Sequence, residues 1–474
     1  MPIRKQNIPI LLSYSIVITL FIVTINNSFF YDTIYYGSKL AEYYYITNLS
    51  FRLPDSIECG YFPTFGMYIA LIWKVLGRDL VSSHLAMLPF IIGIIWQLER
   101  LIRKFVPRGT SGLALLIILI DPTLLSQMTL VSPDVLLIFF FILGLNSVLE
   151  NKRILISIAI IFLFLIHMRG IIISFCILLI DIHVNISFSN SIKKIIVDLI
   201  KRSIIYLPAF FIFLAFSYYH YITKGWILFH YDSPWAELFQ KVGFKRIIYN
   251  IGIIGWRIID FGRIGIWIVF FILLFRLRKD ILKSKKTLLL FFIFSVLLIL
   301  LTASLVWAKN LLAHRYLLPV YLCFSLLCAN ILFNHPVDFI LKRTLIYVWI
   351  IILISGNFWV YPDRIDKGWD STLAHLPYFN MRKQAIEYLD EQEINYENVQ
   401  SFYPNTTIID YLDLNFDNRS FSNFNDSCDY VIYSNVFNIK DEDYDLIKTQ
   451  YVIIKHFNRG LVYLDICKKI IPKR

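Results

Sequence analysis

Residues 288–305 read LLLFFIFSVLLILLTASL, an apolar stretch without a charged residue. Residues 154–166, ILISIAIIFLFLI, form a second uncharged stretch. A helix needs about 20 apolar residues to cross the hydrocarbon core of a bilayer, which is roughly 30 Å thick. Because such stretches recur along the chain, the sequence predicts a polytopic α-helical membrane protein.

The composition agrees with this prediction. Of the 474 residues, 57% are hydrophobic and 17% charged, and the mean hydropathy is +0.62. Soluble domains are about 45–50% apolar and about 25% charged, so a soluble domain, a disordered chain, collagen and a coiled coil are excluded. The net charge of +12 arises in short loops between apolar stretches, which is typical of the positive-inside pattern. We therefore expect the lipid bilayer, and no nucleic acid, as a partner.

The apolar pattern predicts about eleven spans within residues 1–361. They are residues 8–30, 80–98, 111–129, 133–149, 154–167, 170–182, 203–221, 264–275, 287–307, 316–333 and 344–361. The first span follows Arg4 and Lys5 and lacks a cleavage site, so we expect a cytoplasmic N-terminus. The main outer loops are then residues 31–79 and 222–263, and the odd count places residues 362–474 outside.

Residues 362–474 are polar and acidic, and we expect them to form a small α/β domain. Helical spacing marks residues 381–392. Enrichment in β-branched and aromatic residues predicts strands at 399–403, 430–433, 451–456 and 461–466. Cys428 and Cys467 could form a disulfide if this domain faces an oxidising compartment.

Ionisable side chains collect on the predicted outer face, several of them at the ends of spans. These are Asp32, Asp55, Glu58, Asp121, Asp134, Arg169, Arg257, Arg263, Lys309, His314 and Arg315. Ionisable groups at membrane depth are costly and usually face a cavity or a partner. Acids and bases that converge on one leaflet indicate a site, whereas a transporter more often places them near the midplane.

Asp32 is the sharpest candidate among the acids. It lies just past the first span among aromatic residues, where a carboxylate can act as a general base. The alternative is an interfacial aspartate that ends a helix, with Tyr36 in an aromatic belt. Asp134 opens a span after Ser132 and Pro133, where a carboxylate equally favours the helix dipole.

The basic candidates suit an anionic ligand. Arg315, with His314 beside it, could hold a lipid phosphate, because a guanidinium group matches phosphate geometry. Lys309 lies one turn away if that segment is helical, and Arg257 and Arg263 are weaker phosphate candidates. Arg169 follows His167 at a break between two short spans and indicates a pocket wall. The alternatives are headgroup snorkelling for Arg315 and a simple turn at Arg169.

Nucleotide and metal motifs are missing from the sequence. There is no Walker A loop, no GxGxxG and no His/Cys cluster with metal spacing. The acids at Asp441 and Asp443 read as solvated surface. We expect no cofactor; a divalent metal would be possible, but no motif supports it.

The order of these motifs resembles that of the GT-C glycosyltransferases, which include protein O-mannosyltransferases and the aminoarabinose transferases acting on lipid A. The resemblance covers residues 8–360. The matching motifs are Asp32 followed by Tyr36, Lys39 and Ala41; Gly60-Tyr61-Phe62-Pro63 followed by Leu76-Gly77; Ser132-Pro133-Asp134; His167-Met168-Arg169-Gly170; and His314-Arg315-Tyr316-Leu317-Leu318-Pro319.

The resemblance implies a polyprenyl-phosphate sugar donor, transfer at the outer leaflet and inversion of the anomeric centre. Asp32 would be the base, Asp134 a second acidic residue of the catalytic site, and Arg315, with His314, would neutralise the leaving polyprenyl phosphate. From their positions on the outer face we also expect Lys309 and Arg169 to bind the donor phosphate. On the same ground we expect the substrates to be lined by Glu58, Asp55, Tyr36, Tyr316 and Asp121. Many relatives have an acidic residue directly after the first aspartate; here it is Thr33, which puts metal assistance at that position in doubt.

We therefore expect a multi-pass glycosyltransferase of a bacterial inner membrane, with a periplasmic C-terminal domain and a glycan, lipid or protein acceptor. A polysaccharide or lipid flippase is an alternative, but it predicts charges along several spans and repeat symmetry. An outer-leaflet polysaccharide polymerase or ligase would need a large Arg- and His-rich outer loop, which residues 222–263 match in part. A non-catalytic scaffold would tolerate the loss of Asp32.

Overall fold

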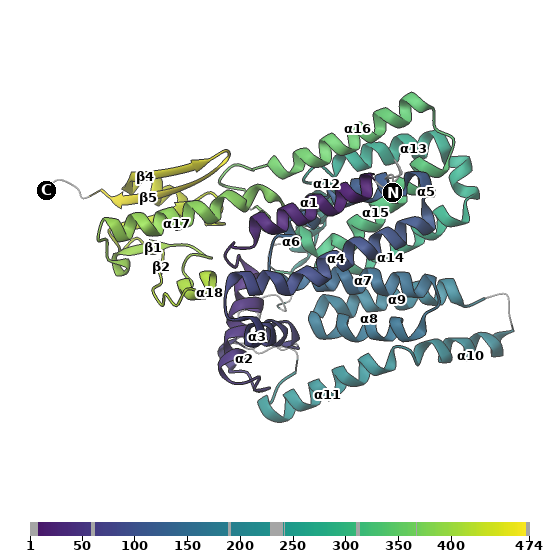
Figure 1. Ribbon diagram of the computed structural model, residues 1–474, viewed down its shortest axis with the longest axis horizontal. Helices are drawn as coiled ribbons and strands as arrows, with labels where there is room; N and C mark the ends of the chain where they lie inside the picture. Colours follow the sequence, from purple (N-terminus) through teal and green to yellow (C-terminus); the bar gives the residue numbers. More distant parts are fainter. Residues whose placement is uncertain are drawn as a thin grey trace, which may run out of the picture.

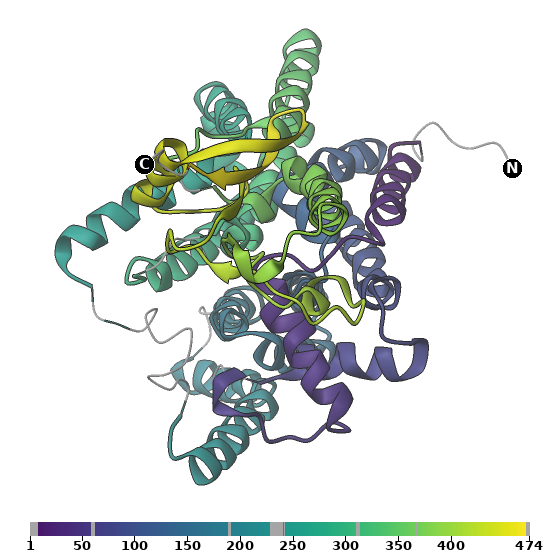
Figure 2. The same ribbon diagram turned by 90° about the vertical axis from the view of Figure 1, so that its left-hand side faces the viewer.

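The molecule is a helical bundle with a small mixed domain at one end (Figure 1). The structure is a computed structural model, and it describes residues 8–57, 62–187, 191–227, 240, 242–309, 313–365 and 367–470. Figure 2 looks along the bundle from the end that carries the C-terminal domain and shows this domain in front of the helices. The predicted fold class, a helical membrane protein with a C-terminal α/β domain, is confirmed.

The α-helices of the bundle are α1 (Ile8–Thr24), α2 (Leu40–Ile46), α3 (Thr64–Leu76), α4 (Leu80–Phe105), α5 (Arg108–Leu119), α6 (Pro122–Met128), α7 (Pro133–Leu149), α8 (Arg153–Ile166), α9 (Met168–Asn185), α10 (Ile192–Ser203), α11 (Leu207–Lys224), α12 (Phe244–Ile259), α13 (Ile264–Lys283), α14 (Lys285–Leu305), α15 (Leu318–Asn334) and α16 (Phe339–Ser355). A short 3-10 helix, η5 (His314–Leu317), precedes α15.

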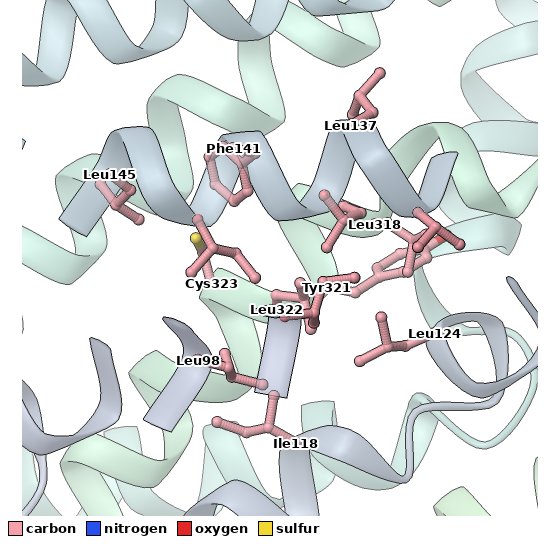
Figure 3. Packing of buried hydrophobic residues seen from close by; sticks show 14 of the residues in the cluster. Leu98, Ile118, Leu124, Leu137, Phe141, Leu145, Leu318, Tyr321, Leu322 and Cys323 are labelled. Atoms are coloured by element: carbon pink, nitrogen blue, oxygen red, sulfur yellow. The ribbon is translucent and has the colours of Figure 1, made fainter. Parts of the chain in front are cut away.

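Helix α15 lies at the centre of the bundle. The most apolar 18 residues of η5 and α15 are 94% buried, against 28% for α14 and 22% for α16 with the turn that follows it. Phe141 and Leu145 of α7 belong to the same buried apolar core as Leu318 and Leu322 of α15 (Figure 3). An apolar helix that is not covered by protein needs another apolar environment, so the exposed faces of α14 and α16 fit contact with lipid.

Each predicted span overlaps at least one helix of the bundle. Among the described residues, five helices are long and apolar enough to cross a membrane, or up to eight if each bent pair counts as one span. Four shorter apolar helices are α1, α3, α7 and α8. The count of about eleven spans therefore stays a prediction.

Two predicted segments need correction. The span predicted at 111–129 is two helices, α5 and α6, bent by 74°. Pro122 has no N–H for an α5 hydrogen bond, and the side chain of Asp121 instead accepts from the N–H groups of Thr123 and Leu124. The predicted loop 222–263 contains the amphipathic helix α12, which is bent by 83° from α13.

The first outer loop is also largely helical. The amphipathic stretch predicted at Thr64–Leu76 is α3, and it packs against α2. A β-carbon on Gly66 would lie 2.5 Å from the β-carbon of Leu40, so the glycine permits this close packing. The buried Trp73 indole donates to Ser83 Oγ at 2.7 Å and ties α3 to α4.

The C-terminal domain contains a five-stranded sheet in the order β2-β1-β3-β5-β4. Its strands are β1 (Val399–Ser401), β2 (Ser422–Asn423), β3 (Tyr430–Ser434), β4 (Tyr451–Arg459) and β5 (Val462–Lys469), and its helices are α17 (Leu376–Glu391), α18 (Ile409–Asp413) and α19 (Asp441–Gln450). Strand β1 pairs with β2 and β3 in parallel, and β5 pairs with β3 and β4 antiparallel. The four predicted strands and the predicted helix are confirmed. Cys428 and Cys467 are free thiols.

The C-terminal domain and the bundle share buried residues. Phe30 and Leu130 of the bundle belong to the apolar core of the domain, while Leu412 of the domain belongs to the core of the bundle. The Phe29 N–H donates to the Leu412 carbonyl at 2.9 Å. The boundary at residues 361 and 362 stays a prediction, but the domain is firmly docked on the end of the bundle that carries the candidate site.

Candidate active site

Arg315 is the centre of a charged cluster that lines the cavity described below. Its guanidinium group pairs with Asp32 and Asp370, and its Nε lies 3.1 Å from Oδ2 of Asp134. The arginine side chain is only 9% exposed. Its partners come from the first outer loop, the start of α7 and the segment after α16, so the tertiary fold assembles the cluster.

Arg169 gives the cluster a second cation. Its Nη1 lies 2.7 Å from Oδ1 of Asp134, and its guanidinium lies 4.3 Å from the ring centre of Tyr316. His167 Nδ1 accepts from the Arg169 N–H at 3.1 Å and caps α9 after the break from α8. The break between the two short helices therefore aims Arg169 at the site.

Local turns position the acids. Pro133 occupies the first turn of α7, and Ser132 Oγ accepts from the Asp134 N–H at 3.2 Å, so Asp134 lies at the positive end of the helix dipole. Tyr31 has φ of +48°, and Thr33 Oγ1 accepts from the Phe30 N–H at 2.8 Å. This tight turn after α1 directs Asp32 to Arg315.

Hydrogen bonds from α6 hold the segment that carries Asp370. Gln127 Nε2 and Ser126 Oγ each donate to the Asp370 carbonyl at 2.8 Å. Ser132 Oγ in turn donates to Gln127 Oε1 at 2.7 Å. The main chain around Asp370 is therefore fixed while its carboxylate faces Arg315.

These side chains enclose a polar cavity of about 60 Å³. It is lined by Asp32, Thr33, Tyr36, Gln127, Ser132, Pro133, Asp134, His167, Arg169, Arg315, Tyr316 and Asp370. The lining carries three carboxylates and two guanidinium groups. Asp32 is the most exposed of the acids, at 30% against 3% for Asp134 and 10% for Asp370.

The structure brings together six of the predicted site residues: Asp32, Tyr36, Asp134, Arg169, Arg315 and Tyr316. Four others lie elsewhere. Asp121 pairs with Arg263 at 2.7 Å, Asp55 with Lys224 at 2.5 Å, and His314 with Asp260 at 2.7 Å. Lys309 donates to Gln240 Oε1 at 2.8 Å. Glu58, together with Gly60 and Tyr61 of the quoted motif, falls outside the described residues.

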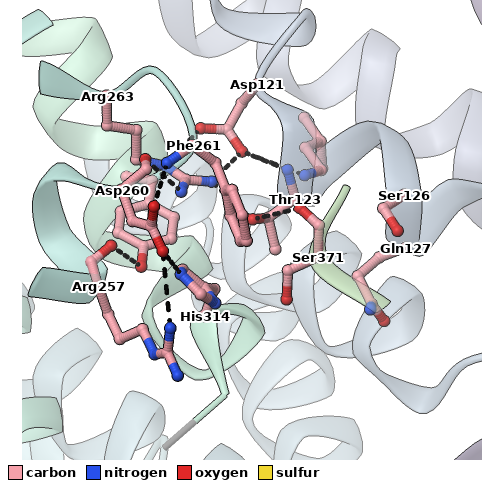
Figure 4. A network of polar contacts seen from close by, with 12 residues as sticks. Asp121, Thr123, Ser126, Gln127, Arg257, Asp260, Phe261, Arg263, His314 and Ser371 are labelled. Atoms are coloured by element: carbon pink, nitrogen blue, oxygen red, sulfur yellow. Dashed lines mark hydrogen bonds and ion pairs between the residues drawn. The ribbon is translucent and has the colours of Figure 1, made fainter. Parts of the chain in front are cut away.

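His314 and Asp121 instead belong to a second, buried polar network (Figure 4). Arg263 bonds Asp121 through two nitrogens, at 2.7 and 2.8 Å, and its Nη2 donates to Thr123 Oγ1 at 2.6 Å. Arg257 Nη1 lies 3.6 Å from Oδ2 of Asp260. The two weaker phosphate candidates, Arg257 and Arg263, are thus buried in ion pairs outside the cavity.

Sequence reasoning missed Asp370 and Gln127. Asp370 lies in the outer segment directly after the last predicted span, next to Trp369, which is a signal that could have included it. Gln127 lies within a predicted span, and a polar amide at that depth carried a similar signal.

An apolar groove of about 800 Å³ lies on the other side of α6. It runs along α1 from Leu12 to Leu20 and is closed by the end of α16, by Leu373 and Ala374, and by the turn between β4 and β5. Leu125 faces the groove and Gln127 faces the polar cavity. The groove and the cavity therefore share a wall.

Metal binding has no obvious site here. Within the part of the chain that the structure describes, no group of three or more His, Cys, Asp or Glu residues is arranged to hold a metal ion. The expectation that no cofactor is required stays a prediction.

No family model and no curated protein matches the sequence of the chain. In its fold the chain is similar to ArnT from Cupriavidus metallidurans, solved bound to undecaprenyl phosphate. The chain has an ArnT-like fold. The TM-score is 0.52 and the sequence identity 9%, and the similarity covers 96% of this chain and 97% of ArnT. The ArnT-like fold thus includes the C-terminal domain and confirms the fold that the resemblance to the GT-C glycosyltransferases implied.

Proposed function

We propose that the protein is an integral-membrane glycosyltransferase that moves a sugar from a polyprenyl-phosphate donor to an acceptor. The observation that carries this proposal is the Arg315 cluster, with Asp32, Asp134 and Asp370 around one guanidinium and Arg169 beside it. The ArnT-like fold supports the donor class, because ArnT binds undecaprenyl phosphate.

The two arginines are suited to the leaving group. A guanidinium group donates several hydrogen bonds in a fixed plane and stabilises the negative charge that develops on a departing phosphate. In the structure, the three carboxylates occupy those positions around Arg315. We expect the donor phosphate to bind the Arg315 guanidinium in place of Asp32. The Asp32 carboxylate would then be free at the more exposed side of the cavity.

Asp32 would then act as the base. In the proposed step, its carboxylate takes the proton of an acceptor hydroxyl or amine, and the acceptor atom forms the bond to the anomeric carbon. The bond from that carbon to the phosphate oxygen breaks, and its electron pair leaves with the polyprenyl phosphate. Because attack comes from the face opposite the phosphate, the anomeric centre is inverted.

The distribution of charge supports an outer, periplasmic site in a bacterial inner membrane. Helix α7 begins near Asp134 in the site, and the residue that follows its other end is Glu150. Arg100, Lys104 and Lys152 each lie 2.7 Å from Glu150. Basic residues concentrate on the cytoplasmic side of membrane proteins, which favours a cytoplasmic Glu150 end and a periplasmic Asp134 end.

The apolar groove supports a lipid-borne substrate. A polyprenyl or acyl chain needs a continuous apolar surface, and the groove provides one across α6 from the polar cavity. The location of the charges at one end of the bundle, away from the middle of the spans, favours an enzyme over a flippase. The acceptor class, whether glycan, lipid or protein, is open, and a polymerase or ligase would use the same cavity.

The test is the fate of the lipid-linked sugar in cells that carry Asp32→Asn. We expect the variant to fold, transfer product to fall by at least about 100-fold and the lipid-linked sugar to remain unconsumed, because general base catalysis contributes about 10²–10⁴-fold. Asp55→Asn is the matched control, since Asp55 lies in the same outer loop but pairs with Lys224. Unchanged product in Asp32→Asn would show that this base is wrong and would favour a transporter or a scaffold.

A further inference from the structure

His314 and Arg315 are consecutive residues of η5, but their side chains have different surroundings. Arg315 lines the cavity, whereas the His314 side chain is fully buried, with Nε2 2.7 Å from Oδ2 of Asp260. The Asp260 side chain is also fully buried. Figure 4 shows the two side chains facing each other between Arg257 and Phe261.

Asp260 is a rigid anchor. Its Oδ1 accepts from the Phe261 N–H at 2.8 Å and from the Tyr361 hydroxyl. The next residues, Phe261 and Gly262, have φ of +50° and +80°. A β-carbon on Gly262 would lie 2.1 Å from the carbonyl oxygen of Ile352, so this turn lies directly against the α16 backbone.

The His314 ring also contacts the segment that carries Asp370. A β-carbon on Gly368 would lie 2.6 Å from Nδ1 of His314, so the main chain two residues before Asp370 passes directly over the ring. Asp370 pairs with Arg315. The ring therefore lies between the Asp260 anchor and the main-chain segment that carries Asp370.

We propose that Asp260 and His314 form a positioning pair that fixes Arg315 and Asp370 for binding of the donor phosphate. The proposal rests on the proposed function, because it requires Arg315 to bind that phosphate. Arg315 must exchange carboxylate partners for phosphate when the donor enters. A backbone that stays fixed during this exchange lowers the entropic cost of binding the phosphate, because fewer conformations are lost when the phosphate binds.

The experiment measures binding of undecaprenyl phosphate to the purified full-length protein in lipid nanodiscs. We expect His314→Ala to weaken binding by about 10-fold, in line with the loss of a hydrogen bond to a charged group. His314→Gln should remain within about 3-fold of the wild type, because its amide can donate to Asp260. Asp181→Asn is the matched control, since Asp181 is equally buried and pairs with Arg202 in a network outside the cavity lining.

The decisive comparison repeats His314→Ala in the Arg315→Lys background. A positioning role predicts that the tenfold effect largely disappears there, because the fork that His314 positions is gone. An equal loss in both backgrounds, an equal loss in Asp181→Asn, or a His314→Gln variant as weak as His314→Ala would overturn the positioning role. Unchanged binding in Arg315→Lys alone would instead overturn the phosphate site of the proposed function, and this inference with it.

Discussion

Arg315 balances three carboxylates with one guanidinium group. Asp32, Asp134 and Asp370 would repel one another in a cavity of this size, and Arg315 bonds all three of them. Arg169 shares Asp134 and lies over Tyr316. At the scale of single residues, Arg315 and Arg169 therefore offset the repulsion between the three acids.

Arg315→Lys should leave the fold intact but reduce transfer by at least about 100-fold. Lysine keeps the positive charge but lacks the rigid fork that bonds several oxygens at once, and hydrogen bonds to charged groups contribute about 1.5–3 kcal/mol each. Steady-state transfer of the lipid-linked sugar by the purified variant measures this loss. Arg364→Lys is the control, because its pair with Asp445 is 55% and 56% exposed. Equal activity in both variants would contradict a role for the fork.

Several residues of the candidate active site lie close to breaks between helices. The break before α6 lies at Asp121, the break before α9 at His167, and η5 precedes α15. Side chains cap the main-chain groups left at the first two breaks, Asp121 at the start of α6 and His167 at the start of α9. At the scale of the elements, breaks between helices therefore place polar residues where a continuous apolar span would not.

Gly170→Ala tests the break between α8 and α9. A β-carbon at Gly170 would lie 1.8 Å from the carbonyl oxygen of Leu163, so the two backbones would have to separate and Arg169 would shift. We expect a loss of about 1–3 kcal/mol in stability, as for overpacking, together with weaker binding of undecaprenyl phosphate. Thermal unfolding and binding of the same preparation measure both effects.

The control for Gly170→Ala is Gly255→Ala in α12, where a β-carbon would meet nothing within 4 Å. This variant should be neutral or stabilised by up to about 1 kcal/mol, because alanine favours the helix. A Gly170→Ala protein that is as stable and binds as well as Gly255→Ala would show that the close approach is unimportant.

At the scale of the whole molecule, the C-terminal domain packs next to the candidate active site. It follows the segment that contributes Asp370, and its core includes Phe30, which lies two residues before Asp32. His375 stacks on Phe30 with ring centres 5.0 Å apart, and its Nδ1 lies 2.6 Å from the Thr372 carbonyl oxygen. The domain therefore packs against the same loop that carries Asp32.

The stability of the folded protein, with the C-terminal domain packed on the bundle, should decrease as the pH falls from about 6.5 to about 4. Burial lowers the pKa of His375 to about 4, while an unfolded histidine titrates near 6.5. Between these pH values the unfolded state binds more protons than the folded state. The contribution of His375 to stability is therefore fully present above about pH 6.5 and is lost as the pH falls towards 4. The shift corresponds to about 3 kcal/mol at most.

His375→Gln isolates this contribution. The variant loses the stacking on Phe30 and should be less stable than the wild type at pH 7, but its stability relative to the wild type should rise by up to about 3 kcal/mol as the pH falls to 4. Unfolding midpoints of both proteins in the same detergent across this range provide the measurement. A difference that stays constant with pH would mean that His375 does not titrate as its burial implies.

The apolar pattern by itself determined the membrane-protein fold class, and enrichment in β-branched and aromatic residues located four of the five strands of the C-terminal domain. These features depend on local composition, because an apolar segment must leave water wherever it lies in the chain. The same pattern assigned Asp32, Asp134, Arg169 and Arg315 to one face, and the structure brings these four side chains together.

Only the tertiary structure decided which charged residues meet. His314 and Asp121 lie on the predicted face as Arg315 does, yet they pair with Asp260 and Arg263 in a separate network. Asp370, which no motif marked, joins Arg315 instead. The physical reason is that the partner of a side chain depends on how helices rotate and how closely backbones approach, and local sequence does not specify either of these.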